Sequence, residues 1–221
     1  KERFFKTNAC LFVIRTIKTH APLYLRIIRA CTPHPKHRFQ VLECIILIHT
    51  DKAIYYFYNL PMNNINIKVI AGSTREGRFS DKAAAKIAAE FKKHEGVTVE
   101  VLDLRDYEMP FFNEAATPSY KAAPYTHEAV AQFTAKIAEG DAYVLVTPEY
   151  NRSTSGVLKN ALDWVYQEWN NKPVAFVSYG SVGGSRAVEH LRLMAIELQM
   201  APIRNAVHIP GADYFPVIMG N

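Results

Sequence analysis

Three short polar or glycine-rich segments contain the residues of this 221-residue chain whose types and spacing could hold a ligand. They are GSTREGRFS at residues 72–80, PEYNRSTS at 148–155 and YGSVGGS at 179–185. Small residues let a ligand approach the backbone closely, and arginine adds charge-assisted hydrogen bonds to an anion. Where such a segment leads into a helix, the free N–H groups and the helix dipole favour a phosphate. The three segments together therefore predict a site for a phosphorylated ligand.

The first segment differs from the two best-known phosphate loops. Gly72 and Gly77 fit the triphosphate pattern GxxxxGK followed by Ser or Thr, but Arg78 replaces the lysine and Phe79 replaces the hydroxyl that would hold Mg²⁺. The dinucleotide pattern GxGxxG is also broken, because Thr74 occupies its second glycine position. The segment therefore favours a phosphomonoester over a nucleoside triphosphate or the pyrophosphate of a dinucleotide.

The second segment can border a flat heterocycle. Pro148 removes one backbone donor while the following N–H groups stay available for ring carbonyls and nitrogens, with Tyr150 beside them. The competing interpretation is a plain strand-to-helix turn in which Asn151 or Ser153 caps the next helix.

The third segment offers both a ligand loop and a competing hydrolase motif. Its three glycines allow close backbone approach or positive φ angles, which favours a ligand beside the other two segments. GxSxA around Ser185 resembles the nucleophile elbow of hydrolases, with His190, His208 and Asp213 downstream. The hydrolase order requires a histidine after the acid, and none follows Asp213. Ser185 is therefore interpreted as a helix N-cap and the two histidines as ordinary ones.

Alternating strand and helix patterns must position these segments. Short apolar strands alternating with amphipathic helices predict an α/β fold, with a doubly wound five-stranded parallel sheet and helices on both faces. The three segments follow the first, third and fourth strands, at the carboxyl ends where such sheets bind ligands. The predicted strands are 65–71, 97–104, 142–147, 174–178 and 203–209, and the predicted helices are 80–94, 126–138, 156–168 and 185–198.

Composition divides the chain near Met62. Residues 1–61 contain 10 Lys or Arg and 3 Asp or Glu, whereas residues 62–221 contain 16 and 18, so the two parts carry about +7 and −2. All three cysteines precede Met62 and all ten glycines follow it. We expect residues 1–61 to be a basic extension outside the fold and residues 62–221 to form the functional domain. The absence of a disulfide framework favours the cytoplasm, and we expect neither a nucleic-acid nor a membrane partner.

Two other interpretations of the first 61 residues stay open. The many bases and single acid before residue 43 suit a targeting presequence, although the scattered prolines fit that less well. Cys31, His34 and His37, with Cys44 or His49, could ligate a metal, but their spacing matches no standard zinc pattern. We therefore expect no metal site.

The ordered motifs resemble those of a known family. GSTREGR at 72–78, PEYNRSTSGVLKNALDW at 148–164 and SYGSVGGSRA at 178–187 resemble the NADPH-dependent FMN reductases of the flavodoxin-like superfamily, which includes quinone, azo-dye and chromate reductases. The resemblance covers residues 64–210 and none of residues 1–61. It implies a flavodoxin-like fold in which the closing C-terminal helix is truncated, because only about a dozen residues follow the fifth strand.

The same resemblance implies the cofactors, the site and the reaction. FMN and NADPH are the implied cofactors, and two electrons would pass from NADPH through FMN to a small acceptor such as a quinone. No protein side chain is then required as a catalytic acid or base. The alternative is an FMN-holding electron carrier or redox sensor without NADPH turnover. The implied cofactor-binding residues are Gly72, Ser73, Arg75, Arg78 and Ser80 at the phosphate, Pro148, Glu149, Tyr150 and Asn151 at the ring, and Ser178, Tyr179, Gly180, Gly183 and Gly184 at the ring edge.

The resemblance also implies a homodimer or homotetramer. Trp164 and Trp169 lie near one end of the third predicted helix, close to the second segment. We expect them at a dimer edge that helps to form the site.

Overall fold

The computed structural model describes the backbone of residues 3–7, 10–18, 23–32, 40–49, 52–59, 64–120 and 125–219, with side chains only from residue 64 onward. The chain divides into two units, Lys1–Asn63 and Asn64–Asn221. That residues 1–61 lie outside the functional domain stays a prediction. The cysteines and histidines considered for zinc lie outside the described side chains.

The first unit contains a single antiparallel sheet of five strands in chain order. The sequence did not predict these strands, because its apolar residues follow no sustained period. They are β1 (Arg3–Thr7), β2 (Cys10–Lys18), β3 (Leu23–Thr32), β4 (Gln40–His49) and β5 (Lys52–Asn59).

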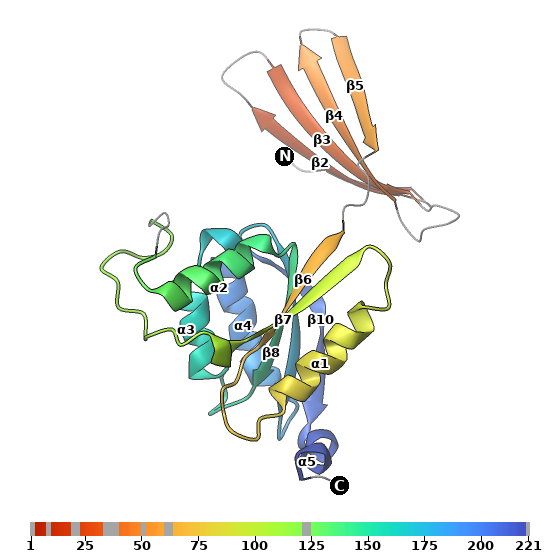
Figure 1. Ribbon diagram of the computed structural model, residues 1–221. Helices are drawn as coiled ribbons and strands as arrows, with labels where there is room; N and C mark the ends of the chain where they lie inside the picture. Colours follow the sequence, from red (N-terminus) through yellow and green to blue (C-terminus); the bar gives the residue numbers. More distant parts are fainter. Residues whose placement is uncertain are drawn as a thin grey trace. The chain divides into compact units, whose positions relative to one another are not determined.

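The second unit is an α/β fold around an all-parallel sheet (Figure 1). The strands lie in the order β10-β9-β8-β6-β7, which is 2-1-3-4-5 in this unit's own chain order and confirms the flavodoxin-like topology. The strands are β6 (Ile65–Ala71), β7 (Val97–Asp103), β8 (Ala142–Pro148), β9 (Pro173–Gly180) and β10 (Ala201–Pro210). The helices are α1 (Ser80–Phe91), α2 (Glu128–Glu139), α3 (Gly156–Trp164), α4 (Ser185–Glu197) and α5 (Gly211–Met219), with short 3₁₀ turns η1 (Leu104–Asp106) and η2 (Gln167–Trp169).

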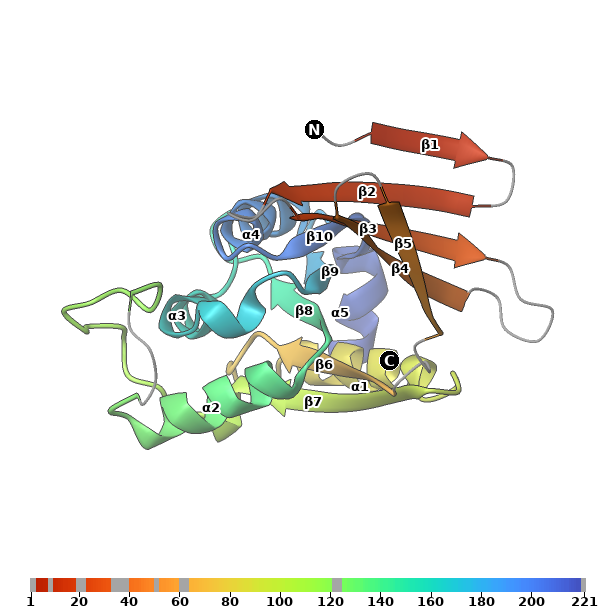
Figure 2. The ribbon, with the colours of Figure 1, turned by 90° about the horizontal axis from the view of Figure 1, so that it is seen from above.

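Helices cover both faces of the sheet, as predicted. Successive strand residues point to opposite faces, so Val69 of β6 packs in the cluster under α1 while Ile70 packs in the cluster under α2, α3 and α4. Seen from above, α1 and the group of α2, α3 and α4 lie on opposite sides of the strands (Figure 2). Helix α5 packs on the α1 side through Tyr214 and Ile218.

Three details of the sequence analysis need correction. Trp164 and Trp169 are fully buried in the core, so they form no exposed dimer edge. The third helix ends at Trp164, and a separate 3₁₀ turn follows at Gln167–Trp169. Residues after β10 form α5, which was not predicted because Pro216 interrupts its pattern. Whether the closing helix is truncated relative to the family stays a prediction.

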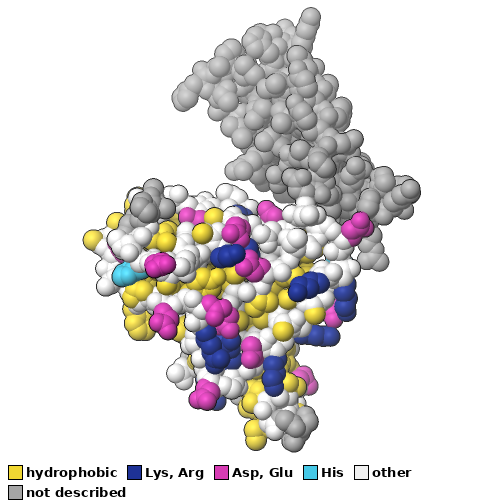
Figure 3. All heavy atoms as spheres, in the orientation of Figure 1, with side chains coloured by type: hydrophobic (Ala, Val, Ile, Leu, Met, Phe, Trp, Pro, Cys, Tyr) yellow, Lys and Arg dark blue, Asp and Glu magenta, His cyan; other side chains and the backbone are white. Residues whose placement is uncertain are grey.

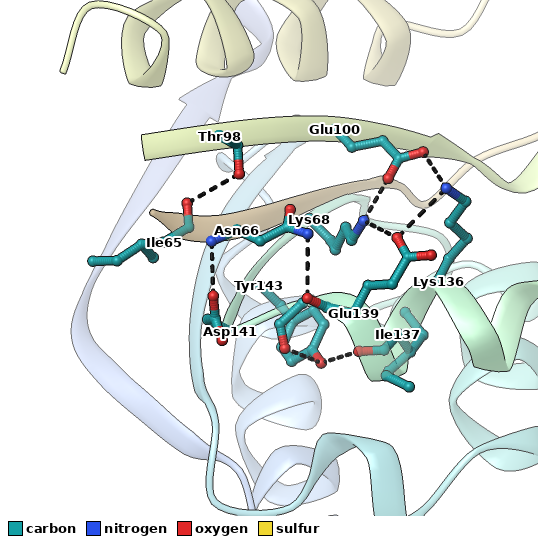
Figure 4. A network of polar contacts seen from close by, with 12 residues as sticks. Ile65, Asn66, Lys68, Thr98, Glu100, Lys136, Ile137, Glu139, Asp141 and Tyr143 are labelled. Carbon is teal, nitrogen blue, oxygen red and sulfur yellow. Dashed lines mark hydrogen bonds and ion pairs between the residues drawn. The ribbon is translucent and has the colours of Figure 1, made fainter. Parts of the chain in front are cut away.

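A buried lysine on β6 ties the neighbouring edge strand β7 to α2 (Figure 4). The side chain of Lys68 on β6 is 1% exposed, and its ammonium group contacts the carboxylates of Glu100 on β7 and Glu139 on α2. Lys136 contacts the same two carboxylates at 3.0 and 3.5 Å, so positive and negative groups alternate. Burial of Glu100 opposes ionisation, but hydrogen bonds from Lys68 and Lys136 outweigh it and lower the pKa of Glu100.

The surface of the second unit carries mixed charges. On the face drawn in Figure 3, Lys and Arg side chains are interspersed with Asp and Glu. No helix within residues 64–120 and 125–219 is long and apolar enough to cross a membrane.

Candidate functional site

Three loops leave neighbouring strands at one edge of the parallel sheet. The first loop (residues 72–79) follows β6, the second loop (149–155) follows β8, and the third loop (181–184) follows β9. Because β6, β8 and β9 are adjacent and parallel, their carboxyl ends bring these loops together. The topology therefore confirms that the three segments meet.

The first loop begins at a position that only glycine fits. A Cβ on Gly72 would lie 2.6 Å from the carbonyl oxygen of Val146 and 2.8 Å from Leu158. The close approach lets the Gly72 N–H donate to that same carbonyl oxygen at 2.8 Å. Gly72 thus sets where the loop leaves the sheet.

Hydrogen-bond donors in the first loop remain available. Among the described residues, no acceptor is recorded for the backbone N–H groups of Ser73, Thr74, Glu76 and Gly77, while the Arg75 N–H donates to the Ser73 hydroxyl at 3.3 Å. The exposed side chain of Arg75 has no hydrogen-bond or ion-pair partner in the described part of the chain. Free amides beside an unpaired guanidinium make a site for an anion.

Protein groups hold the two Nη atoms of Arg78, while its buried Nε has no hydrogen-bond partner among the described residues. Its side chain is 4% exposed and makes a two-pronged ion pair with Asp103 at the end of β7, with Nη1 2.7 Å from Oδ1. Nη1 also donates to the carbonyl oxygen of Ser73 at 2.5 Å. The hydrogen bond with Asp103 raises the pKa of the Arg78 guanidinium, against the effect of burial. This placement favours Arg78 as a brace of the first loop, while a direct phosphate contact stays a prediction.

Arg105, which the sequence analysis did not single out, braces the same loop. Its Nε donates to the carbonyl oxygen of Thr74 at 3.2 Å and its Nη2 to that of Arg75 at 2.7 Å. Both Arg105 and Asp103 lie where β7 runs into η1. Their role depends on β7 lying next to β6, which chain order alone does not specify.

Two buried hydroxyls lie beside the first loop, one on Ser80 at the start of α1 and one on Tyr179 of β9. Ser80 was predicted to cap α1, but the helix begins at Ser80, and the capping position is Phe79, which makes no side-chain cap hydrogen bond. Ser80 Oγ and the Tyr179 hydroxyl are both buried, and neither makes a hydrogen bond of standard geometry among the described residues, although Ser80 and Ser73 are close enough to Tyr179 to oppose the rise of its pKa. Burial raises the pKa of Tyr179 to about 12, so the phenol stays protonated.

The side chain of Tyr179 lies beside the first loop. Its ring packs edge-on against Phe79 of the first loop, with centroids 5.2 Å apart. The sequence placed Tyr179 at the ring edge of a flavin, beside the third loop. The strand alternation of β9 points its side chain to the α1 face, opposite Ser178, and a contact of Tyr179 with the ring edge stays a prediction.

The second loop contains a tight two-residue turn. Tyr150 and Ser153 exchange backbone hydrogen bonds of 2.9 and 3.0 Å, and Asn151 and Arg152 between them have φ angles of 50° and 68°. Two successive left-handed residues are typical of a type I′ turn. The cap of α3 is Ser155, whose hydroxyl accepts from the Leu158 N–H at 3.2 Å, so Asn151 and Ser153 do not cap α3.

Side chains of the second loop hold the other two loops. The Tyr150 hydroxyl is 3.1 Å from Ser73 Oγ in the first loop. Glu149 accepts from the Arg186 side chain at 3.0 Å and from the Arg186 N–H at 3.2 Å, which ties the loop to the start of α4. Both Glu149 oxygens are therefore engaged by Arg186. The predicted ring contact of Pro148, Glu149, Tyr150 and Asn151 stays a prediction.

The third loop depends on left-handed glycines. Gly184 has φ 73°, and a Cβ there would lie 2.7 Å from Ser178 Cβ and 2.9 Å from the Tyr179 N. The Ser178 hydroxyl donates to the Gly183 carbonyl oxygen at 2.7 Å and contacts His208 Nδ1 at 2.8 Å. Ser178 of β9 thus holds the third loop in place through the Gly183 carbonyl oxygen.

The structure gives no support to the hydrolase interpretation. Ser185 is the first residue of α4 and Gly184 is the capping residue, so Ser185 is not the predicted cap. Within the described residues, no hydrogen bond joins Ser185 to His190 or His208. No group of three or more potential metal ligands occurs among the described side chains.

A cavity of about 410 Å³ adjoins the first loop. Its walls come from Thr74, from the chain after β7 and from α3. Burial raises the pKa of Tyr107 in this wall. The lining residues are Thr74, Leu104, Arg105, Tyr107, Glu108, Met109, Phe111, Val157 and Asn160.

Comparisons with known proteins agree with this geometry. The family described as NADPH-dependent FMN reductase matches residues 65–213. The chain is 36% identical over 146 residues to an NAD(P)H-dependent FMN reductase of Schizosaccharomyces pombe, covering 65% of this chain and 73% of that protein. It is 32% identical over 142 residues to an NAD(P)H:quinone oxidoreductase of Solanum tuberosum, covering 62% and 70%.

A solved structure shows the same fold. The flavoenzyme NAD(P)H:(acceptor) oxidoreductase of Paracoccus denitrificans superposes with a TM-score of 0.52 at 26% identity, over 64% of this chain and 78% of that one. With the family match extending over more than half of the chain, from β6 into α5, this protein belongs to the NADPH-dependent FMN reductase family.

Proposed function

We propose that this chain binds FMN across its three loops and passes two electrons from NAD(P)H to a small quinone-type acceptor. Its family consists of NAD(P)H-dependent flavin oxidoreductases, which use FMN. The observation that carries the proposal is the set of unpaired donors in the first loop, next to the unpaired guanidinium of Arg75. A phosphomonoester with several acceptor oxygens fits such a set.

At the phosphate end, the amides of the first loop and Arg75 would hold the dianion. The buried hydroxyls of Ser80 and Tyr179 lie beside the same loop, and neither makes a hydrogen bond of standard geometry, which is typical of a place where a ligand completes the hydrogen bonding. Arg78 would act without touching the phosphate, because it links the Ser73 carbonyl oxygen of the first loop to Asp103 at the end of β7.

At the ring end, the second and third loops would border the isoalloxazine. The bonds of Glu149 to Arg186 and of Ser178 to Gly183 hold these loops rigid before any ligand arrives, which reduces the cost of ordering them on binding. A bound FMN would supply the redox chemistry, the transfer of two electrons from the nicotinamide to the acceptor, at the place that these two loops border. The protein's own task is to bind and orient the reactants, and we expect no side chain to act as a catalytic acid or base.

The class of electron acceptor is inferred from the activities of similar proteins. Similar proteins include the quinone oxidoreductase of Solanum tuberosum and a 2-hydroxy-1,4-benzoquinone reductase of Burkholderia sp.. A small quinone is therefore the acceptor to test first. The cytoplasmic address and the homodimer or homotetramer also stay predictions, since the described residues include no partner chain.

The test is a flavin titration of the full chain. FMN absorbance is recorded before and after anaerobic addition of NADPH or NADH, and again after addition of a benzoquinone. We expect bound flavin to bleach and then to recover. Flavin that binds without bleaching would support the electron-carrier alternative, and absence of flavin binding would refute the proposal.

A matched pair of variants tests the phosphate end. Arg75→Ala removes the unpaired cation of the first loop, whereas Arg204→Ala removes an exposed cation near the amino end of β10. Loss of a charge-assisted contact should weaken FMN binding about tenfold or more in Arg75→Ala. Equal FMN affinity in the two variants would remove Arg75 from the site.

A further inference from the structure

A pair of side chains on neighbouring strands supports the third loop. His208 of β10 and Ser178 of β9 are register partners in the parallel sheet, and His208 Nδ1 lies 2.8 Å from the Ser178 hydroxyl. The third loop packs against this pair, because a Cβ on Gly183 would lie 3.0 Å from His208 Cβ. His208, which the sequence analysis interpreted as an ordinary histidine, therefore contacts a loop of the candidate site.

The hydrogen bonds of Ser178 decide which imidazole nitrogen carries the proton. The buried Ser178 hydroxyl has one proton, and the Gly183 carbonyl oxygen accepts it at 2.7 Å, whereas the Val207 carbonyl oxygen is 3.4 Å away. With its proton used in this way, the hydroxyl oxygen can only accept from His208. Both contacts are satisfied when Nδ1 of His208 is the donor, so the neutral ring carries its proton on Nδ1.

The Gly183 carbonyl sets the direction of the next N–H group. The Gly183 C=O and the Gly184 N–H belong to one planar peptide, and in a trans peptide these two groups point in opposite directions. Because the carbonyl points toward Ser178, the Gly184 N–H points away from Ser178. The glycines on both sides of this peptide have φ angles of 76° and 73°, so side chains do little to fix its orientation. The Ser178 hydroxyl supplies that constraint.

The Gly184 N–H is one of several unused donors in the third loop. In residues 64–120 and 125–219, no acceptor is recorded for the N–H groups of Ser181, Val182 and Gly184. They lie just before α4 begins, where the helix dipole adds to their attraction for negative charge. Such donors suit a ring atom on which negative charge develops during reduction.

We propose that His208 is a positioning residue, which acts through Ser178 to aim the Gly184 N–H at the ring edge of FMN. The inference rests on the proposed function, in which the third loop borders the isoalloxazine. The reduced ring is an anion at neutral pH, whereas the oxidised ring is neutral. An aimed N–H therefore binds the reduced form more strongly than the oxidised form, and its loss makes bound FMN harder to reduce.

The test compares the affinities of the full chain for oxidised FMN and for anaerobically reduced FMN. In His208→Leu the preference for the reduced form should fall about tenfold relative to wild type, which lowers the midpoint potential of bound FMN by about 30 mV. Ser178→Ala should have an effect of similar size. Adding His208→Leu to Ser178→Ala should lower the preference no further, because both residues act through one chain of hydrogen bonds.

Two further variants separate aiming from packing. His208→Asn places an amide N–H near the position of Nδ1, so it should retain the wild-type preference. His94→Leu removes an exposed histidine just beyond the end of α1 that lies away from the first loop, and it should also retain the preference. A role in packing alone would weaken both redox forms equally in His208→Leu. That result, or an unchanged preference, would overturn the assignment.

Nitrogen NMR of the imidazole gives an independent measurement on the wild type. The His208 signals are identified by their loss in His208→Asn and recorded at a pH where the ring is neutral. We expect the proton on Nδ1, and a proton on Nε2 would overturn the proposed chain of hydrogen bonds. Failure of the proposed function gives a different result, because the wild type would then bind neither redox form of FMN.

Discussion

Replacing Asp103 with asparagine tests whether Arg78 is a brace of the first loop. Asp103→Asn removes one partner of a pair whose arginine side chain is 4% exposed, leaving the guanidinium with the Ser73 carbonyl oxygen. Breaking a buried ion pair in this way costs about 3–5 kcal/mol, and because 27% of the Asp103 side chain reaches solvent we expect about 2–3 kcal/mol here. For a domain of this size that lowers Tm by about 5–10 °C.

The pH dependence gives an independent signature. Burial of Asp103 opposes ionisation, but the hydrogen bond from Arg78 outweighs it, so the pKa of Asp103 lies below its ordinary value of 3.8. A carboxylate with a lowered pKa in the folded state adds stability above its unfolded pKa and loses it as pH falls through the folded pKa. The Tm difference between wild type and Asp103→Asn should therefore be full at pH 6 and shrink below pH 3.8.

A double variant separates charge from packing. Replacing both partners of a buried pair by apolar residues is often neutral, so Arg78→Met with Asp103→Leu should unfold at a higher temperature than Asp103→Asn alone. Circular dichroism on the full chain at pH 6 measures both. Each kcal/mol of lost stability should lower Tm by about 2–4 °C. A Tm of Asp103→Asn within about 1 °C of the wild-type Tm would therefore refute the brace.

Three further variants probe local features of the fold. Lys68→Met should flatten the loss of stability in acid, because the lowered pKa of Glu100 depends in part on Lys68, and urea unfolding at pH 3 to 6 measures it. Arg152→Gly should raise Tm by a few degrees by removing the left-handed strain, worth about 1–2 kcal/mol and partly offset by glycine entropy. Gly184→Ala should lower the free energy of unfolding by about 1–3 kcal/mol, since the new Cβ meets Ser178 at 2.7 Å with φ at 73°.

Local patterns were enough to predict the α/β fold. A short continuous apolar run such as Ile65–Ala71 indicates a buried strand, and apolar residues at helical spacing in Ser80–Phe91 indicate an amphipathic helix. The alternation of the two kinds of segment along the chain predicts a parallel sheet. The loops then follow, because ligand loops leave the carboxyl ends of parallel strands. The same patterns did not predict the strands of the first unit, because these strands have no alternation of apolar and polar residues.

Side-chain direction was harder to predict than position. Arg78 has the right type and place for a phosphate ligand, yet it turns to Asp103, a partner 25 residues away that is reached only because β7 lies beside β6. The direction of the Tyr179 side chain, in contrast, could have been predicted from the sequence. Counting alternate residues along β9 from Ser178 would have placed its side chain on the α1 face.

The second loop contains a departure from local sequence preference. Asn-Gly is the dipeptide that a type I′ turn favours, and this chain has Asn151 followed by Arg152. The four residues Tyr-Asn-Arg-Ser do not reveal from sequence alone that the turn has only two central residues. The paired backbone hydrogen bonds of Tyr150 and Ser153 show it. Arg152 departs from this preference, and the two backbone hydrogen bonds between Tyr150 and Ser153 hold the turn in place in spite of it.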